Sequence, residues 1–130
     1  MTVGRSSSPT HQKGSAAEDA ALLFLQQQGF AVLAQNYHTP YGELDIVAQR
    51  QQLLLFVEVR LRKAGALVSA AESVTPRKQQ KIIQSAQHFL QQYAAYASCD
   101  CRFDVLALTP QRTPAGSYAM DWIQAAFQAE

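Results

Sequence analysis

Residues 42–60, GELDIVAQRQQLLLFVEVR, contain two apolar runs in which acidic side chains alternate with β-branched or aromatic ones. Successive side chains of a strand point to opposite faces, so the alternation predicts two strands, with Glu43 and Asp45 on one face of the first. Glu58 and Arg60 share a face of the second. The connection between the runs is short, which favours an antiparallel hairpin. The stretch therefore predicts a hairpin that carries both carboxylates and a guanidinium.

Turning the apolar faces of both strands to one core would gather Asp45, Glu58 and Arg60 on the opposite face. Two carboxylates beside a guanidinium can bind a hard divalent cation and a phosphate group. The alternative interpretation is a solvated sheet face, where such charges add only modest stability. The apolar run over residues 53–57 favours a functional site, because a charge on a strand buried on both faces is costly unless it is paired or metal-bound.

Composition bounds the kind of protein. The chain has 130 residues, of which 48% are hydrophobic and 16% charged, enough for one domain with its own core. We predict a disordered tail over residues 1–12 and a single domain over residues 13–130. The net charge of +1 carries no signal for nucleic acid, but residues 50–81 contain seven basic and only two acidic side chains. This local excess favours a phosphate-bearing partner. The candidate contacts are Arg60, Arg62, Lys63, Arg77, Lys78 and Lys81.

No run of about 18 apolar residues and no secretory h-region is present, so we expect a cytoplasmic protein that does not enter a membrane. The two cysteines, Cys99 and Cys101, are too few for a zinc site, and the three histidines fall at no ligand spacing. We therefore predict structural thiols.

The segments around the hairpin have their own signals. We expect a helix over residues 15–28 closed by Gly29, and another that starts at Thr75-Pro76 and runs to about Ala97. The other expected elements are strands over residues 30–37 and 101–108, a short edge strand over 117–120 and a closing helix over 121–128. The order α-β-β-β-α-β-(β)-α predicts a mixed α/β fold, in which the long helix returns the last major strand parallel to an earlier one.

This order, with the acidic pair on the central hairpin, resembles the restriction-endonuclease fold and its PD-(D/E)xK pattern. A closer resemblance is to the YraN family of small bacterial proteins, which is similar to archaeal Holliday-junction resolvases. The resemblance rests on the order and spacing of motifs across residues 13–127. These motifs are Ala17-Glu18, Gly29-Phe30, Asn36-Tyr37, Gly42-Glu43-Leu44-Asp45, Phe56-Val57-Glu58-Val59-Arg60, the Lys78 region and Arg102-Phe103-Asp104.

The resemblance implies an endonuclease that uses Mg²⁺ or Mn²⁺ to cut DNA, possible substrates being branched or repair-intermediate structures, and a homodimer by analogy with the resolvases. Asp45 and Glu58 would bind the metal together with the backbone carbonyl of Val59. Arg60 stands where the pattern has lysine. Glu18, on the first helix, matches a position that reaches toward the metal site in related resolvases.

Two of these assignments leave alternatives open. Glu18 also fits a capping box with Ser15, in which it would bind backbone instead of metal. Arg60 stays protonated, so its role would be electrostatic, and Lys78 or Lys81 is the alternative source of an ammonium group.

Three functions remain open from the sequence. The first is a metal-dependent nuclease, and the second is a catalytically weak or inactive nucleic-acid-binding module of the same fold. The third is a protein-interaction role in which the acidic pair is only a surface feature.

Overall fold

A computed structural model describes residues 15–129, without the side chain of Ser15, so the predicted disordered tail lies outside the described residues. Its elements follow one another along the chain as α1 (Ser15–Gln27), β1 (Ala31–Thr39), β2 (Gly42–Arg50), β3 (Leu53–Leu61), α2 (Ala70–Ser73), α3 (Pro76–Gln92), β4 (Asp100–Pro110) and β5 (Tyr118–Phe127).

The strands form one five-stranded sheet in the order β1-β2-β3-β4-β5. Neighbouring strands are antiparallel, except that β3 and β4 run parallel. The parallel pair is possible because the chain crosses over through α2 and α3 before it re-enters the sheet. The mixed α/β class, the central hairpin and the parallel return are thus confirmed.

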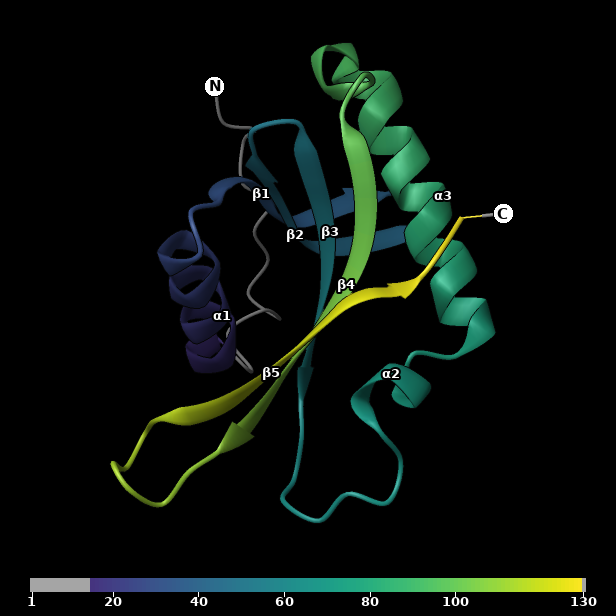
Figure 1. The fold of residues 1–130 in the computed structure, drawn as a ribbon. Helices are drawn as coiled ribbons and strands as arrows, with labels where there is room; N and C mark the ends of the chain where they lie inside the picture. Colours follow the sequence, from purple (N-terminus) through teal and green to yellow (C-terminus); the bar gives the residue numbers. More distant parts are fainter. Residues whose placement is uncertain (1–14, 130) are drawn as a thin grey trace.

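Helices cover both faces of the sheet, α1 on one side and α3 on the other (Figure 1). Apolar residues of α1, such as Leu25, pack with Ile46 and Leu55, while residues of α3, such as Phe89, pack with Val47 and Phe56. The hairpin is therefore buried on both faces, as the run over residues 53–57 indicates.

This arrangement corrects one expectation. The carboxylates do not occupy a face opposite a single core: Glu58 lies within ion-pair distance of Lys78 on α3, the helix that covers Phe56 on the same strand. The sheet has two cores, and the carboxylates lie beyond the end of one of them.

The C-terminal segment also differs from the prediction. Residues 118–127 form the edge strand β5 instead of a short strand followed by a helix. Its apolar residues Trp122, Ile123, Ala126 and Phe127 have helical spacing, but pairing with β4 places Ile123 opposite Val105. Pairing with the neighbouring strand β4 overrides the local helical pattern here.

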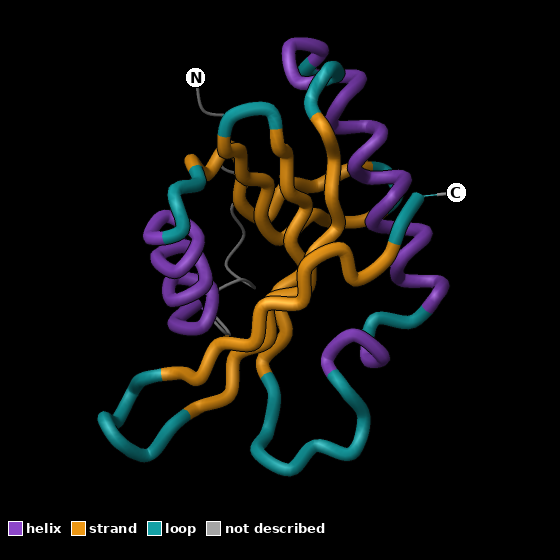
Figure 2. The backbone as a smooth tube through the Cα atoms, viewed as in Figure 1, coloured by secondary structure: helices purple, strands orange, loops and turns teal. Residues whose placement is uncertain are grey.

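The helix that starts at Pro76 is shorter than expected. It ends at Gln92, and a 3-10 turn follows over Ala94–Tyr96. Figure 2 shows two loops that protrude at one end of the molecule, one between β3 and α2 and one between β4 and β5.

Candidate metal and phosphate site

The site lies where β2 and β3 separate. Their pairing ends at Ile46 and Val57. Beyond that pair the Asp45 side chain replaces the backbone ladder, because its Oδ2 accepts a hydrogen bond of 2.9 Å from the Val59 N–H. The N–H and C=O of one strand residue point to the same side, so the Val59 carbonyl is also directed toward Asp45. A carboxylate and a carbonyl oxygen therefore face the same opening.

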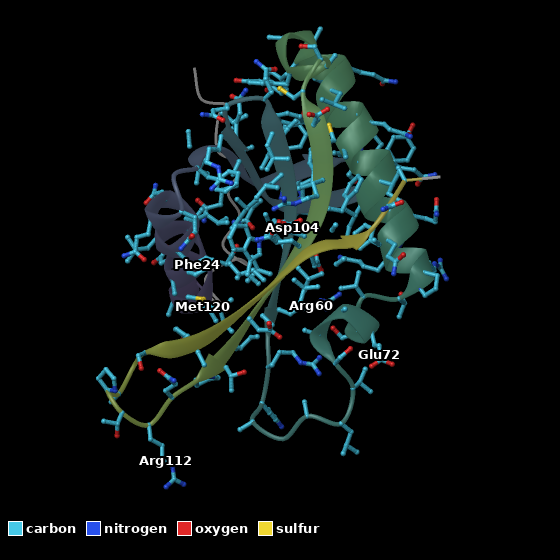
Figure 3. All side chains as sticks on the ribbon, viewed as in Figure 1. Phe24, Arg60, Glu72, Asp104, Arg112 and Met120 are labelled. Carbon is cyan, nitrogen blue, oxygen red and sulfur yellow. The ribbon has the colours of Figure 1, made fainter. Side chains whose placement is uncertain are left out.

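The second carboxylate belongs to Glu58, the residue of β3 that precedes Val59. Glu58 is only 6% exposed, and its Oε2 lies 3.1 Å from Arg60 Nη2 and 3.9 Å from Lys78 Nζ. In Figure 3 Arg60 lies between β3 and α2, above the loop that joins them. Arg60 and Lys78 remain partly exposed, so the two cations lie between the buried acid and solvent.

The acids influence each other. Burial raises the pKa of Asp45 well above its ordinary value, and the negative charge of Glu58 raises it further, while the hydrogen bond from Val59 acts in the opposite direction. A carboxylate that is desolvated beside a second acid is stabilised by a nearby cation. The electrostatics therefore fit a divalent metal ion.

The donor set also fits such an ion. Mg²⁺ is commonly held by one or two carboxylates, with water and substrate phosphate completing the shell. Within residues 15–129 no group of three or more His, Cys, Asp or Glu residues is arranged to hold a metal. Beyond Asp45, Glu58 and the Val59 carbonyl, the remaining ligands would therefore be water and substrate.

The start of α3 positions Lys78. Thr75 caps the helix by accepting a hydrogen bond from the Lys78 N–H at 3.2 Å, and Pro76 occupies the first turn. Farther along α3, the helix lies close to the β1–β2 turn, so a Cβ at Gly42 would come within 3.7 Å of the Lys81 Cβ. Gly42 has a φ of 153°, which other residues rarely adopt. The cap and this close contact fix α3 beside the fork, the place where β2 and β3 separate.

The other predicted basic residues occupy different positions. The Arg62 side chain donates to the Val68 carbonyl, whereas Lys63, Arg77 and Lys81 are exposed. Lys81 is the weaker of the two alternative ammonium donors, because only Lys78 makes an ion pair with Glu58 among the described contacts.

Glu18 lies on α1, the helix that covers the other face of the sheet. The structure does not bring it into a three-acid group with Asp45 and Glu58. Its alternative role as a cap also stays a prediction, because the Ser15 side chain lies outside the described residues.

Another acidic residue, Asp104, lies outside this site and has a structural role. It is fully buried and accepts two hydrogen bonds of 2.9 Å from Arg102, one of 2.8 Å from Trp122 Nε1 and one of 3.0 Å from the Ala125 N–H. Asp104 is thus paired with Arg102, a basic residue of the same strand. Its bonds to β5 were missed, because that segment has a helical pattern.

Cys99 and Cys101 are free thiols. Burial raises the pKa of Cys101, and Cys99 and Asp100 add to the shift. The thiol form is therefore favoured over the reactive thiolate.

The sheet, the helices on both faces and the paired carboxylates define a mixed α/β protein with a nuclease-like fold. The chain belongs to the Uncharacterised protein family UPF0102, the YraN family, whose model matches residues 17–108. The resemblance found in the sequence is thereby confirmed. The match runs from α1 into β4 and contains every candidate site residue.

Relatives with the same family name cover most of the chain. A UPF0102 protein from Saccharophagus degradans is 48% identical over 117 residues, which is 90% of this chain and 93% of the relative. One from Dichelobacter nodosus is 43% identical over 88% of each chain. A third, from Pseudomonas savastanoi, is 43% identical over 94% of this chain and 98% of its own length.

The helices give no sign of a membrane span. Within residues 15–129, none combines the length and the apolar character that crossing a bilayer requires.

Proposed function

We propose that this protein is a metal-dependent nuclease that hydrolyses phosphodiester bonds in DNA in the cytoplasm, with branched or repair-intermediate structures as its substrates. The observation that carries the proposal is the fork between β2 and β3. There Asp45 is fixed by the Val59 N–H beside the buried Glu58, and the raised pKa of Asp45 indicates a site that favours a cation.

In this proposal Asp45, Glu58 and the Val59 carbonyl hold Mg²⁺ or Mn²⁺. When bound, the metal ion would supply a Lewis acid and a more acidic water molecule. The chain's own contribution is to keep both acids oriented, through a backbone hydrogen bond on Asp45 and ion pairs on Glu58.

Arg60 would bind the phosphate. Its guanidinium contacts Glu58 through Nη2, while Nε has no hydrogen-bond partner in the described part of the chain. A guanidinium with an unused donor is suited to a phosphate oxygen and cannot act as a base at ordinary pH.

Lys78 would supply the ammonium group that the PD-(D/E)xK pattern places at position 60. Its Nζ lies 3.9 Å from Glu58 Oε2, although the residue comes from α3 instead of β3. A lysine there can neutralise the charge that develops on the phosphate during hydrolysis.

The direct test incubates the full chain with branched, single-stranded and duplex DNA in Mg²⁺ or Mn²⁺. We expect metal-dependent cleavage that falls by about 100-fold or more in Asp45→Ala and Glu58→Ala. Lys78→Gln should reduce the rate while leaving DNA binding largely intact. Asp19→Ala, at an exposed position on α1, is the matched acidic control and should cleave normally. Cleavage that survives loss of both carboxylates would overturn the proposed site.

The ion pairs also support a second candidate, a nucleic-acid-binding module without turnover. Glu58 already has two cationic partners, and arginine replaces the lysine of the pattern. This candidate predicts salt-sensitive DNA binding with no cleavage in any divalent metal. Activity gained on Arg60→Lys would then identify a nuclease that has lost its catalytic lysine.

The proposed homodimer follows from the analogy with resolvases, since a four-way junction has twofold character. Sedimentation with and without branched DNA would test it.

A further inference from the structure

The loop over residues 62–69, between β3 and α2, begins two residues after Arg60 and protrudes from one end of the molecule (Figure 2). It presents apolar side chains to solvent: Leu67 is 101% exposed and Val68 is 51% exposed. A hollow of about 550 Å³ is lined by residues 61–68, so the loop curves outward instead of packing on the domain. Leu61, which is 57% exposed, lines the same hollow, so the loop groups exposed apolar side chains instead of scattering them.

The base of the loop is fixed although its tip is free. The Arg62 N–H donates to the Leu108 carbonyl at 2.8 Å, and the Arg62 side chain donates to the Val68 carbonyl. Ser69 then forms a capping box with Glu72 at the start of α2. The ends of the loop are thereby attached to β4 and α2, so Leu67 is presented at a defined place.

The charges around the tip favour nucleic acid. Arg62 and Lys63 precede the apolar residues at the start of the loop, and the loop continues directly from the strand that carries Glu58 and Arg60. Many DNA-binding proteins insert an apolar side chain between base steps while neighbouring cations hold the phosphates. Unstacking costs least where the stack is already interrupted.

We propose that Leu67 is a wedge that enters the base stack of DNA held at the Asp45–Glu58 site, and that the substrates are DNAs with an interrupted stack, such as branches and nicks. The inference rests on the proposed function for its location. Its readout is base unstacking, which is independent of cleavage.

The test uses the full chain with Ca²⁺ in place of Mg²⁺, so that the DNA stays intact, and a branched DNA with 2-aminopurine at the branch point. Binding should raise the 2-aminopurine fluorescence about threefold, since the base loses its stacked neighbours. Leu67→Ala should abolish the increase and weaken binding to branched DNA by about tenfold, with little change for continuous duplex. Leu67→Phe should restore the increase.

The matched control is Leu23→Ala, which removes a 55% exposed leucine from α1. It should behave as the unaltered protein. Because Leu67 is fully exposed, its replacement should leave the thermal unfolding midpoint unchanged, so a lost signal would report contact with DNA.

Three results would overturn the wedge. They are DNA binding whose fluorescence change survives Leu67→Ala, no DNA binding by any variant, and Leu67-dependent binding to anionic lipid vesicles without unstacking of DNA. Metal-dependent cleavage without Leu67-dependent unstacking would leave the nuclease in place and remove the wedge. Leu67-dependent unstacking without cleavage would support the wedge and identify the protein as a DNA-binding module without turnover.

Discussion

At the scale of single residues, the site depends on how Asp45 is held. Its carboxylate is fixed by the main chain at Val59 and not by a basic side chain, so its partner cannot move away by changing rotamer. Glu58 has the opposite arrangement, since its partners Arg60 and Lys78 are partly exposed and can be displaced by substrate. One acid is therefore rigid, and the other has exchangeable partners.

The raised pKa of Asp45 gives a pH prediction. A group whose pKa is higher in the folded than in the unfolded protein stabilises the fold at pH values below its unfolded pKa, which is 3.8 for Asp45. This contribution is lost as the pH rises through the pKa of the folded state. Asp45→Asn removes the charge that burial penalises and retains an oxygen for the Val59 N–H. It should raise the free energy of unfolding at pH 7 by about 1 kcal/mol, with the gain vanishing near pH 3.

Urea unfolding at a series of pH values measures this difference. Asp19→Asn, at an exposed position, should show none. Added Mg²⁺ should stabilise the unaltered protein and not Asp45→Asn, because ligand binding to the native state raises stability by mass action. If Asp45→Asn gained no stability over the parent protein between pH 3 and pH 7, or lost some, the raised pKa of Asp45 would be contradicted.

At the scale of elements, β4 and β5 are joined by a buried carboxylate as well as by their ladder. The ladder shifts register between Phe103 and Val105, and Ala125 opposite has a φ of 50°. Asp104 lies at this irregularity and accepts the Ala125 N–H, while it also binds Trp122 and Arg102. The side chain thus satisfies a donor that the irregular pairing leaves out of the ladder.

Replacing Asp104 should therefore affect the whole edge of the sheet. Asp104→Asn turns one acceptor oxygen into a donor that faces other donors and leaves Arg102 without its charge partner. We expect a loss of about 2–4 kcal/mol in the free energy of unfolding. Denaturant unfolding measures the loss, and hydrogen exchange should show faster exchange along β5.

Asp121→Asn, on the same strand but exposed, is the matched control and should change stability by less than about 0.5 kcal/mol. Equal stability of Asp104→Asn and its parent would mean that the network contributes little to the attachment of β5.

At the scale of the whole molecule, the basic side chains near β3 lie at its two ends. Arg60 and Lys78 surround Glu58 near the end of the strand at Leu61, and the 62–69 loop continues from that end. Arg50 precedes the other end, where its guanidinium lies 4.4 Å above the Phe30 ring. Of the basic residues within 50–81, Arg60 and Lys78 thus lie against Glu58, whereas Arg50 lies at the other end of β3.

This distribution predicts which cations contact DNA. Arg77→Gln combined with Lys81→Gln removes two exposed charges one turn apart on α3, and should reduce the slope of log binding constant against log salt by about two units. Arg50→Gln removes one cation from the other end of β3 and should leave the slope unchanged. Titrations at several salt concentrations measure both, and a reduction of about one unit in Arg50→Gln, half that of the double variant, would point to net charge in place of a defined surface.

The sequence by itself determined the central hairpin and the helix from Pro76, and it predicted the two acids of the candidate site, Asp45 and Glu58. Each of these follows from periodicity or capping signals within a few residues, which local side-chain geometry fixes. The family also followed from short motifs in a fixed order.

Only the tertiary structure decided which groups surround Asp45 and Glu58, and that residues 118–127 form a strand. Lys78 reaches Glu58 from a helix that begins eighteen residues downstream, and β5 is a strand because β4 lies beside it. The Lys78–Glu58 contact joins different elements, and the β5 ladder needs β4 in place, so the free energy of both appears only when the sheet is assembled. For the same reason, the local pattern predicted a helix at residues 121–128, where pairing with β4 produced a strand.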